Sequence, residues 1–166
     1  MNDILAIINS LTDFHLLNSE TLLLIDNKIY DYQGKEVESD VFSRVKAPFA
    51  IFSNGRYTKQ YLLKEKALKP STDDSAMMFG GKVPFQNTKK FKGKAILLKD
   101  GFIVTGRYPK EVIAAAILIE KMAKTEIVSE RFGKVHYINP LLIKIMHFIY
   151  QRSYTKKAKE AYERSH

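Results

Sequence analysis

The sequence lacks cysteine altogether, and it also lacks long apolar runs. Without a thiol the chain cannot form a disulfide framework, a thiolate nucleophile or a Cys-ligated zinc or iron–sulfur site. The longest apolar run covers residues 112–119, far short of the roughly 20 residues that a membrane-spanning helix needs. Residues 1–5 carry no basic segment and do not resemble a signal peptide. We therefore expect a cytoplasmic protein.

Common catalytic motifs are missing as well. No Gly-rich phosphate loop precedes a helix, and no Gly-x-Ser-x-Gly nucleophile elbow occurs. The four histidines are His15, His136, His147 and His166. No two of them have the i, i+4 or H-x-H spacing that places two imidazoles around one metal ion. The spacing favours structural roles for all four.

Positive charge is in excess, with 27 Lys and Arg against 18 Asp and Glu and a formal net charge of +9. A run without acids contains six lysines, Lys82, Lys89, Lys90, Lys92, Lys94 and Lys99. A nucleic-acid surface would interleave arginines and aromatic residues with such lysines, but only Phe91 interrupts this run. Solvated lysines are therefore the favoured interpretation. The charge is compatible with a small anionic ligand, and nucleic acid is a disfavoured partner.

Length and composition predict one α/β domain over residues 1–166, with a helical end from about 140. Helical spacing predicts helices over 3–16, 56–66, from Pro109 to about 130, and from Pro140 onwards. Strand pairs are predicted over 21–25 with 28–32 and over 95–98 with 102–105, each around a tight turn. The apolar run 47–52 is compatible with more than one element, and 132–138 is compatible with a strand or a connector.

Residues 95–106, AILLKDGFIVTG, resemble the strand motif "LL-x-x-H-G" of the class II aldolase/adducin family. The helix that begins at Pro109 resembles the helix that follows this strand in the family. Upstream of this strand, the family has another strand that ends in "H-x-H-P-P-Y/F" and is followed by a helix. The segment of this chain that resembles the motif is Arg44-Val45-Lys46-Ala47-Pro48-Phe49. The resemblance implies a three-layer α/β/α fold with a central, mostly antiparallel sheet, and a homo-oligomer.

In the family, zinc is held by the two histidines of "H-x-H" and by the histidine of "H-G". Carried over residue by residue, these degenerate metal-site positions are Arg44, Lys46 and Asp100, and the resemblance therefore implies neither a metal nor another cofactor. A guanidinium has no lone pair to give a metal, and an ammonium has none either. Two alternatives follow: Arg44 and Lys46 form an ion-pair cluster with Asp100, or the alignment of this segment has slipped and they face solvent.

The first functional hypothesis is a binding or scaffold module of unknown ligand, without zinc-dependent lyase activity. The second is an aldehyde-lyase, epimerase or dehydratase that acts on a small sugar phosphate. The third is a basic nucleic-acid-binding protein. The segment before Arg44 is short and has no Gly-, Thr- and Ser-rich turn of the kind that cradles the substrate phosphate in active family members. This absence favours the first hypothesis.

Overall fold

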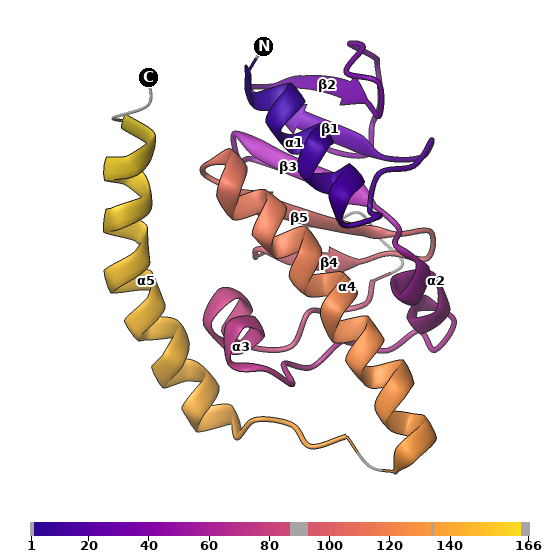
Figure 1. Ribbon diagram of the computed structural model, residues 1–166, viewed down its shortest axis with the longest axis vertical. Coiled ribbons are helices and arrows are strands. Elements are labelled where there is room, and N and C mark those ends of the chain that lie inside the picture. Colours follow the sequence, from indigo (N-terminus) through magenta and orange to yellow (C-terminus); the bar gives the residue numbers. More distant parts are fainter. Residues whose placement is uncertain (1, 87–92, 134, 164–166) are drawn as a thin grey trace.

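The structure, a computed structural model, describes residues 2–86, 93–133 and 135–163 (Figure 1). The helices are α1 (Asn2–Asp13), α2 (Arg56–Leu62), α3 (Asp73–Phe79), α4 (Pro109–Phe132) and α5 (Pro140–Glu163). The strands are β1 (Leu22–Ile25), β2 (Lys28–Asp31), β3 (Phe49–Ser53), β4 (Ala95–Leu97) and β5 (Phe102–Gly106).

The strands form one sheet in the order β2-β1-β3-β5-β4, and all four pairings are antiparallel. The predicted β1–β2 hairpin is confirmed. Its turn residues Asp26 and Asn27 have φ values of 47° and 69°, the left-handed conformation that two-residue hairpin turns require and that Asp and Asn tolerate. The predicted β4–β5 pair is also confirmed.

The apolar run at residues 47–52, which could not be assigned from the sequence, contains most of the central strand β3. All five of its residues are buried, because β1 and β5 flank it on both edges and side chains pack on both of its faces. A strand buried in this way has no polar alternation, and periodicity cannot separate it from a buried helix.

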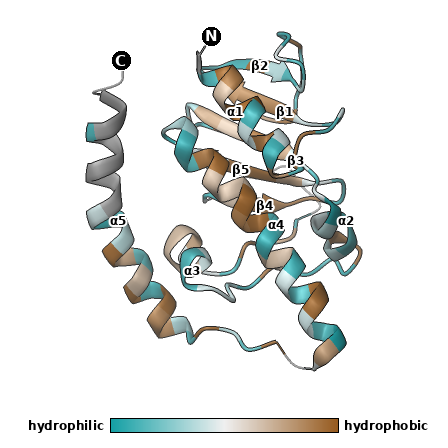
Figure 2. Ribbon diagram, in the orientation of Figure 1, coloured by the Kyte–Doolittle hydropathy of each residue, from teal (hydrophilic) through white to brown (hydrophobic). Residues whose placement is uncertain are grey.

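One face of the sheet carries the main core. Leu23, Ile51 and Val104 point to this face and pack against α1 and α4, which lie across the sheet (Figures 1 and 2). The opposite face, with Ala50, Phe52 and Ile103, forms a second apolar cluster. In the described residues this cluster is covered by Val41, Phe42 and Val45, which belong to a non-helical segment before β3.

The predicted α/β class, the class II aldolase-like domain and the antiparallel sheet are confirmed. Among the described residues, the second apolar cluster contains strand and loop residues and no helix residue. Residues 135–139 lead into α5 without forming a strand.

Helix α5 runs beside α3 and reaches well past it (Figure 1). Ile143 is buried at this contact, and the His147 ring lies with Nδ1 2.6 Å from the carbonyl oxygen of Met77. This histidine is therefore structural, as its isolated position in the sequence predicted. Among the described residues, no helix combines the length and the apolar character needed to cross a bilayer.

Candidate functional site

Asp100 lies in the turn between β4 and β5, which packs against the end of β3. The turn is closed by a hydrogen bond from the Leu98 N–H to the Gly101 carbonyl. A Cβ atom on Gly101 would lie 2.6 Å from the carbonyl oxygen of Ser53 and 2.9 Å from the ring of Phe52. Glycine is therefore required here because only it lets the turn approach β3 so closely.

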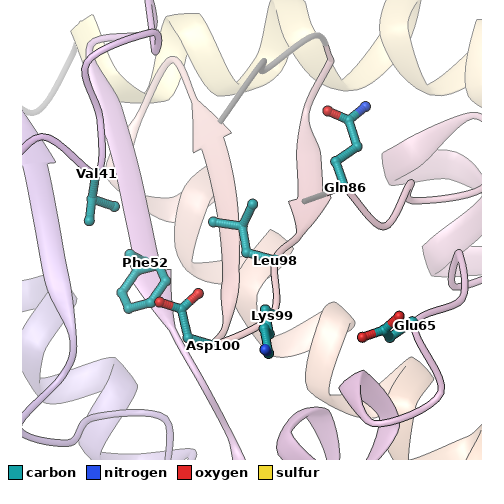
Figure 3. A pocket seen from close by; sticks show the side chains of 7 residues that line it. All are labelled: Val41, Phe52, Glu65, Gln86, Leu98, Lys99 and Asp100. Carbon is teal, nitrogen blue, oxygen red and sulfur yellow. The ribbon is translucent and has the colours of Figure 1, made fainter. Parts of the chain in front are cut away.

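A pocket of about 300 Å³ opens beside this turn (Figure 3). Its lining residues are Val41, Phe52, Glu65, Gln86, Leu98, Lys99 and Asp100. Phe52 and Leu98 are buried and supply an apolar wall, whereas Glu65, Lys99 and Asp100 are exposed. The pocket thus offers two carboxylates, one ammonium and one amide to a small polar molecule.

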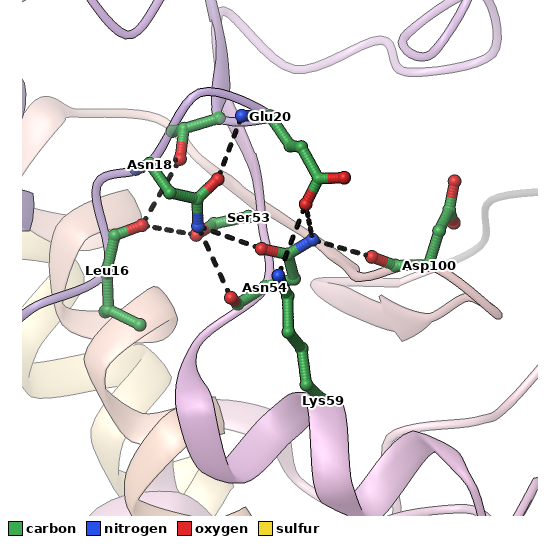
Figure 4. A network of polar contacts seen from close by, with 8 residues as sticks. Leu16, Asn18, Glu20, Ser53, Asn54, Lys59 and Asp100 are labelled. Atoms are coloured by element: carbon green, nitrogen blue, oxygen red, sulfur yellow. Dashed lines mark hydrogen bonds and ion pairs between the residues drawn. The ribbon is translucent and has the colours of Figure 1, made fainter.

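Asn54, immediately after β3, is the centre of a polar network (Figure 4). Its side-chain amide nitrogen donates to Glu20 Oε2 at 2.5 Å and to the Asp100 carbonyl oxygen at 3.0 Å. Its side-chain oxygen accepts a hydrogen bond from Asn18 Nδ2 at 2.8 Å. Asn54 is only 5% exposed, so this residue joins the segment before β1, the end of β3 and the β4–β5 turn.

Glu20 is held by this network on the solvent side. The hydrogen bond from Asn54 and, next, the positive charge of Lys59 lower the pKa of the Glu20 carboxyl below its ordinary value. Lys59 Nζ lies 3.4 Å from Glu20 Oε2. Glu20 therefore stays ionised at neutral pH and places a negative charge next to Asn54.

The corner between β3 and α2 is fixed by a carboxylate from α4. Glu120 accepts hydrogen bonds from the backbone N–H of Tyr57 at 2.7 Å, from the backbone N–H of Thr58 at 3.0 Å and from the Thr58 hydroxyl at 2.5 Å. These are otherwise unpaired donors of the first turn of a helix, where a negative charge is also favoured by the helix dipole. Gly55 leaves the space that this carboxylate occupies, since its Cβ would lie 2.2 Å from Glu120 Oε2.

Arg44 and Lys46 lie before β3 and not at its end. Phe49 pairs with Gly106 and Ser53 pairs with Phe102, so the start of β3 and the Asp100 turn are at opposite ends of the β3–β5 pair. Arg44, Lys46 and Asp100 are exposed, and no ion pair joins Asp100 to either cation in the part of the chain that the structure describes.

The run of lysines does not form one uniform surface. Lys89, Lys90 and Lys92 lie outside the described residues, as does Phe91. Lys94 is mostly buried and forms an ion pair with the buried Glu111. This use of Lys94 within the fold weakens the case for a nucleic-acid surface.

The fold of this chain is similar to that of several solved structures. An L-fuculose 1-phosphate aldolase from Glaciozyma antarctica superposes with a TM-score of 0.72 at 14% identity, over 87% of this chain and 78% of the other. A second L-fuculose 1-phosphate aldolase gives 0.69 at 14% identity, over 90% and 96%. YgbL from Klebsiella pneumoniae gives 0.64 at 15% identity, over 87% and 96%. No protein-family model and no curated protein sequence matches the chain.

The chain has the class II aldolase fold. In the resemblance described above, the "H-x-H-P-P-Y/F" motif ends a strand and leads into a helix. Here β3 ends at Ser53 and α2 begins at Arg56. The segment with the same spacing is Phe52-Ser53-Asn54-Gly55-Arg56-Tyr57, which ends on the motif's aromatic residue. Phe52 and Asn54, unlike Arg44 and Lys46, lie beside the Asp100 turn.

These residues do not fit a zinc ion. Phe52 has no donor atom, and both polar atoms of the Asn54 amide are already engaged by protein groups. One carboxylate, Asp100, is left, whereas zinc sites use three or four protein ligands. Over residues 2–86, 93–133 and 135–163 no group of three or more His, Asp or Glu is arranged around a common point.

Phe52, Asn54 and Glu20 were not among the candidate residues predicted from the sequence. Phe52 and Asn54 could have been found from the order of the elements, in which a strand is followed by the motif and then by a helix. Tyr57 would have marked the aromatic end of the motif. This order was hidden because the strand itself had not been recognised. No sequence pattern points to Glu20, which is brought to Asn54 only by the tertiary fold.

Proposed function

We propose that the chain uses the class II aldolase fold as a binding or scaffold module without zinc-dependent lyase activity. The observation that carries this proposal is the state of Asn54. Its amide nitrogen donates to Glu20 and to the Asp100 backbone and its oxygen accepts from Asn18, at a position where the fold's enzymes would need a metal ligand. A metal could bind only the amide oxygen of Asn54, where it would compete with the hydrogen bond from Asn18.

The pocket beside Asp100 supports binding of a small polar molecule more than turnover of a sugar phosphate. Glu65 and Asp100 supply two negative charges and Lys99 supplies one positive charge. A phosphate group would meet net repulsion at this wall, because like charges a few ångströms apart raise the free energy of binding. Hydroxyl or amino groups would find hydrogen-bond acceptors in the same carboxylates.

The proposal is tested by metal analysis and by a lyase assay on the same preparation. Protein purified without chelator is incubated with excess zinc, desalted and analysed for bound metal, and L-fuculose 1-phosphate is then supplied as substrate. We expect well below one equivalent of zinc and no aldol cleavage. Asp100→His is the matched variant, and it should also remain metal-free because Phe52 and Asn54 still offer no ligand. One equivalent of metal, removed by chelator together with activity, would contradict the proposal.

The enzyme alternative is favoured by the fold itself, which is that of the L-fuculose 1-phosphate aldolases named above. It predicts turnover of a sugar phosphate by aldol cleavage, epimerisation or dehydration. Incubation of the protein with a panel of small sugar phosphates, followed by mass spectrometry and NMR of the products, separates the two hypotheses. Turnover that disappears in Asp100→Ala would favour the enzyme.

A further inference from the structure

A second cavity, of about 430 Å³, lies between the first turns of α5 and the segments that precede α3, follow α3 and precede α5. Its lining residues are Lys69, Pro70, Gly80, Gly81, Lys82, Tyr137, Ile138, Asn139, Pro140, Ile143 and Lys144. None of them lines the pocket beside Asp100. The cavity is therefore a separate site, and its interior is formed mainly by apolar atoms.

The backbone holds two of its lysines opposite each other. Leu68 and Val83 form an antiparallel bridge with N–H to carbonyl distances of 2.9 and 2.8 Å in the two directions. The residues next to this bridge on the cavity side are Lys69 and Lys82, which are thus cross-strand neighbours. Like charges at such a position destabilise a pairing.

Lys144, in the first turns of α5, adds a third positive charge to the lining. Among the described residues, no carboxylate lies within ion-pair distance of Lys69, Lys82 or Lys144. Glu126 acts on Lys69 only at longer range. The three ammonium groups are therefore left without a close counter-charge around an apolar cavity.

Tyr137 gives one wall an aromatic surface with a fixed orientation. Its hydroxyl donates to Glu126 Oε2 at 3.0 Å, and Lys69 Nζ lies 4.9 Å from the centre of its ring. The first turn of α5 forms another wall, where Asn139 caps the helix by accepting from the Leu141 N–H at 2.9 Å. The positive end of this 24-residue helix lies at the cavity and also favours an anion.

We propose that this cavity binds a small amphipathic anion, a molecule with an apolar body and one carboxylate or phosphate head. The apolar body would fill the space against Tyr137 and Ile143. The head group would sit among the lysines and relieve their repulsion. A neutral apolar molecule would leave the three positive charges uncompensated, and a small inorganic anion would leave the apolar walls exposed. The site is independent of whether the chain has lyase activity.

The probes are decanoate and decyl phosphate, which share the apolar chain and differ in the head group, with decanol as the neutral control. Binding is measured by calorimetry below the micelle threshold and located by NMR shift perturbation. Gly81→Leu is the blocking variant: Gly81 lines the cavity and a Cβ there meets nothing within 4 Å, so a leucine is accommodated without a clash and is expected to narrow the cavity. Lys82→Ala/Lys144→Ala removes charge, and Lys46→Ala/Lys110→Ala is the matched control because neither lysine lines the cavity.

We expect decanoate or decyl phosphate to bind at least tenfold more tightly than decanol. Loss of each cavity lysine should weaken binding about fivefold, Gly81→Leu should abolish it, and the control pair should leave it unchanged. Preference between the two head groups identifies the ligand class. Equal binding of decanol and decanoate, an unaltered affinity in Gly81→Leu, or binding to anionic lipid vesicles without binding of free decanoate would overturn the proposal.

Discussion

The corner between β3 and α2 gives the sharpest test of the structure, because a single added methyl group has a defined consequence there. In Gly55→Ala the new Cβ would lie 2.2 Å from Oε2 and 2.4 Å from the carboxyl carbon of Glu120. No real contact is so short, so the Glu120 carboxylate must move. Its three hydrogen bonds to Tyr57 and Thr58 are then lost or distorted.

The expected magnitude follows from those three bonds. A hydrogen bond to a charged group contributes roughly 1.5–3 kcal/mol, but the freed N–H groups of a half-buried helix start regain water. We therefore expect Glu120→Ala to lower the free energy of unfolding by about 2–3 kcal/mol and Gly55→Ala by about 2 kcal/mol. In the double variant the methyl group has nothing to displace. The unfavourable alanine at the N-cap, about 1 kcal/mol, is then largely offset by the lower entropy of the unfolded chain.

The assay is a double-mutant cycle by urea unfolding, with Gly81→Ala as the control glycine substitution because its Cβ meets no atom within 4 Å. The double variant should be about as stable as Glu120→Ala alone, which gives a coupling free energy of about 2 kcal/mol. An unchanged m-value would show that the variants still unfold in the same way. If Gly55→Ala costs as much in the Glu120→Ala background as in the wild type, the contact with Glu120 is not the cause.

Three further predictions concern other parts of the molecule. Asn54→Asp replaces two donors by acceptors facing Glu20 and the Asp100 carbonyl; it should cost about 2–3 kcal/mol at pH 7, and urea unfolding at about pH 4 should show a smaller loss because a protonated carboxyl can donate again. Burial raises the pKa of Glu126, so the folded state binds more protons than the unfolded state and stability falls as pH rises above the ordinary carboxyl pKa. Glu126→Gln should therefore lose less stability than the wild type between about pH 4 and pH 7, and an identical pH profile would contradict this. On helix α5, Ile145 is 48% exposed and Phe148 is 56% exposed, and we expect self-association through this surface. Light scattering should show an oligomer that the double variant Ile145→Glu/Phe148→Glu converts to a monomer. A wild-type monomer at high micromolar concentration would refute this prediction.

Most helices and the two hairpins could be predicted from the sequence because their signals are local. Pro109 begins α4, where a missing N–H is harmless, and Asp26 and Asn27 suit a two-residue turn. The third strand could not be assigned, since burial on both faces removes the alternation that identifies a strand. The cover of the second sheet face by residues 41–45 depends on tertiary contacts of Phe42, and no local signal announces them.

Asp100 was predicted to lie in a turn between two strands, and the structure places it between β4 and β5. This position could be predicted because the motif around it is contiguous in sequence. The other two predicted positions, Arg44 and Lys46, precede β3, whereas the strand end beside the Asp100 turn carries Phe52 and Asn54. The two pairs lie at opposite ends of the sheet, because each residue of a strand advances the chain by roughly 3.3 Å.

Asn54 also explains why this corner cannot combine its present network with a metal site. The amide side chain donates twice from one atom and accepts at the other, and so it satisfies Glu20, the Asp100 carbonyl and Asn18 together. A neutral imidazole at position 54 has one donor and one acceptor, and as a metal ligand it would lose the acceptor to the ion. At least two of the three hydrogen bonds would then be lost, although the exposed Glu20 would still have Lys59 and water as partners. In this chain the three segments that meet at the end of β3 are held together by hydrogen bonds, and a metal site at this corner would require donor side chains in place of Phe52 and Asn54 and a rearrangement of this network.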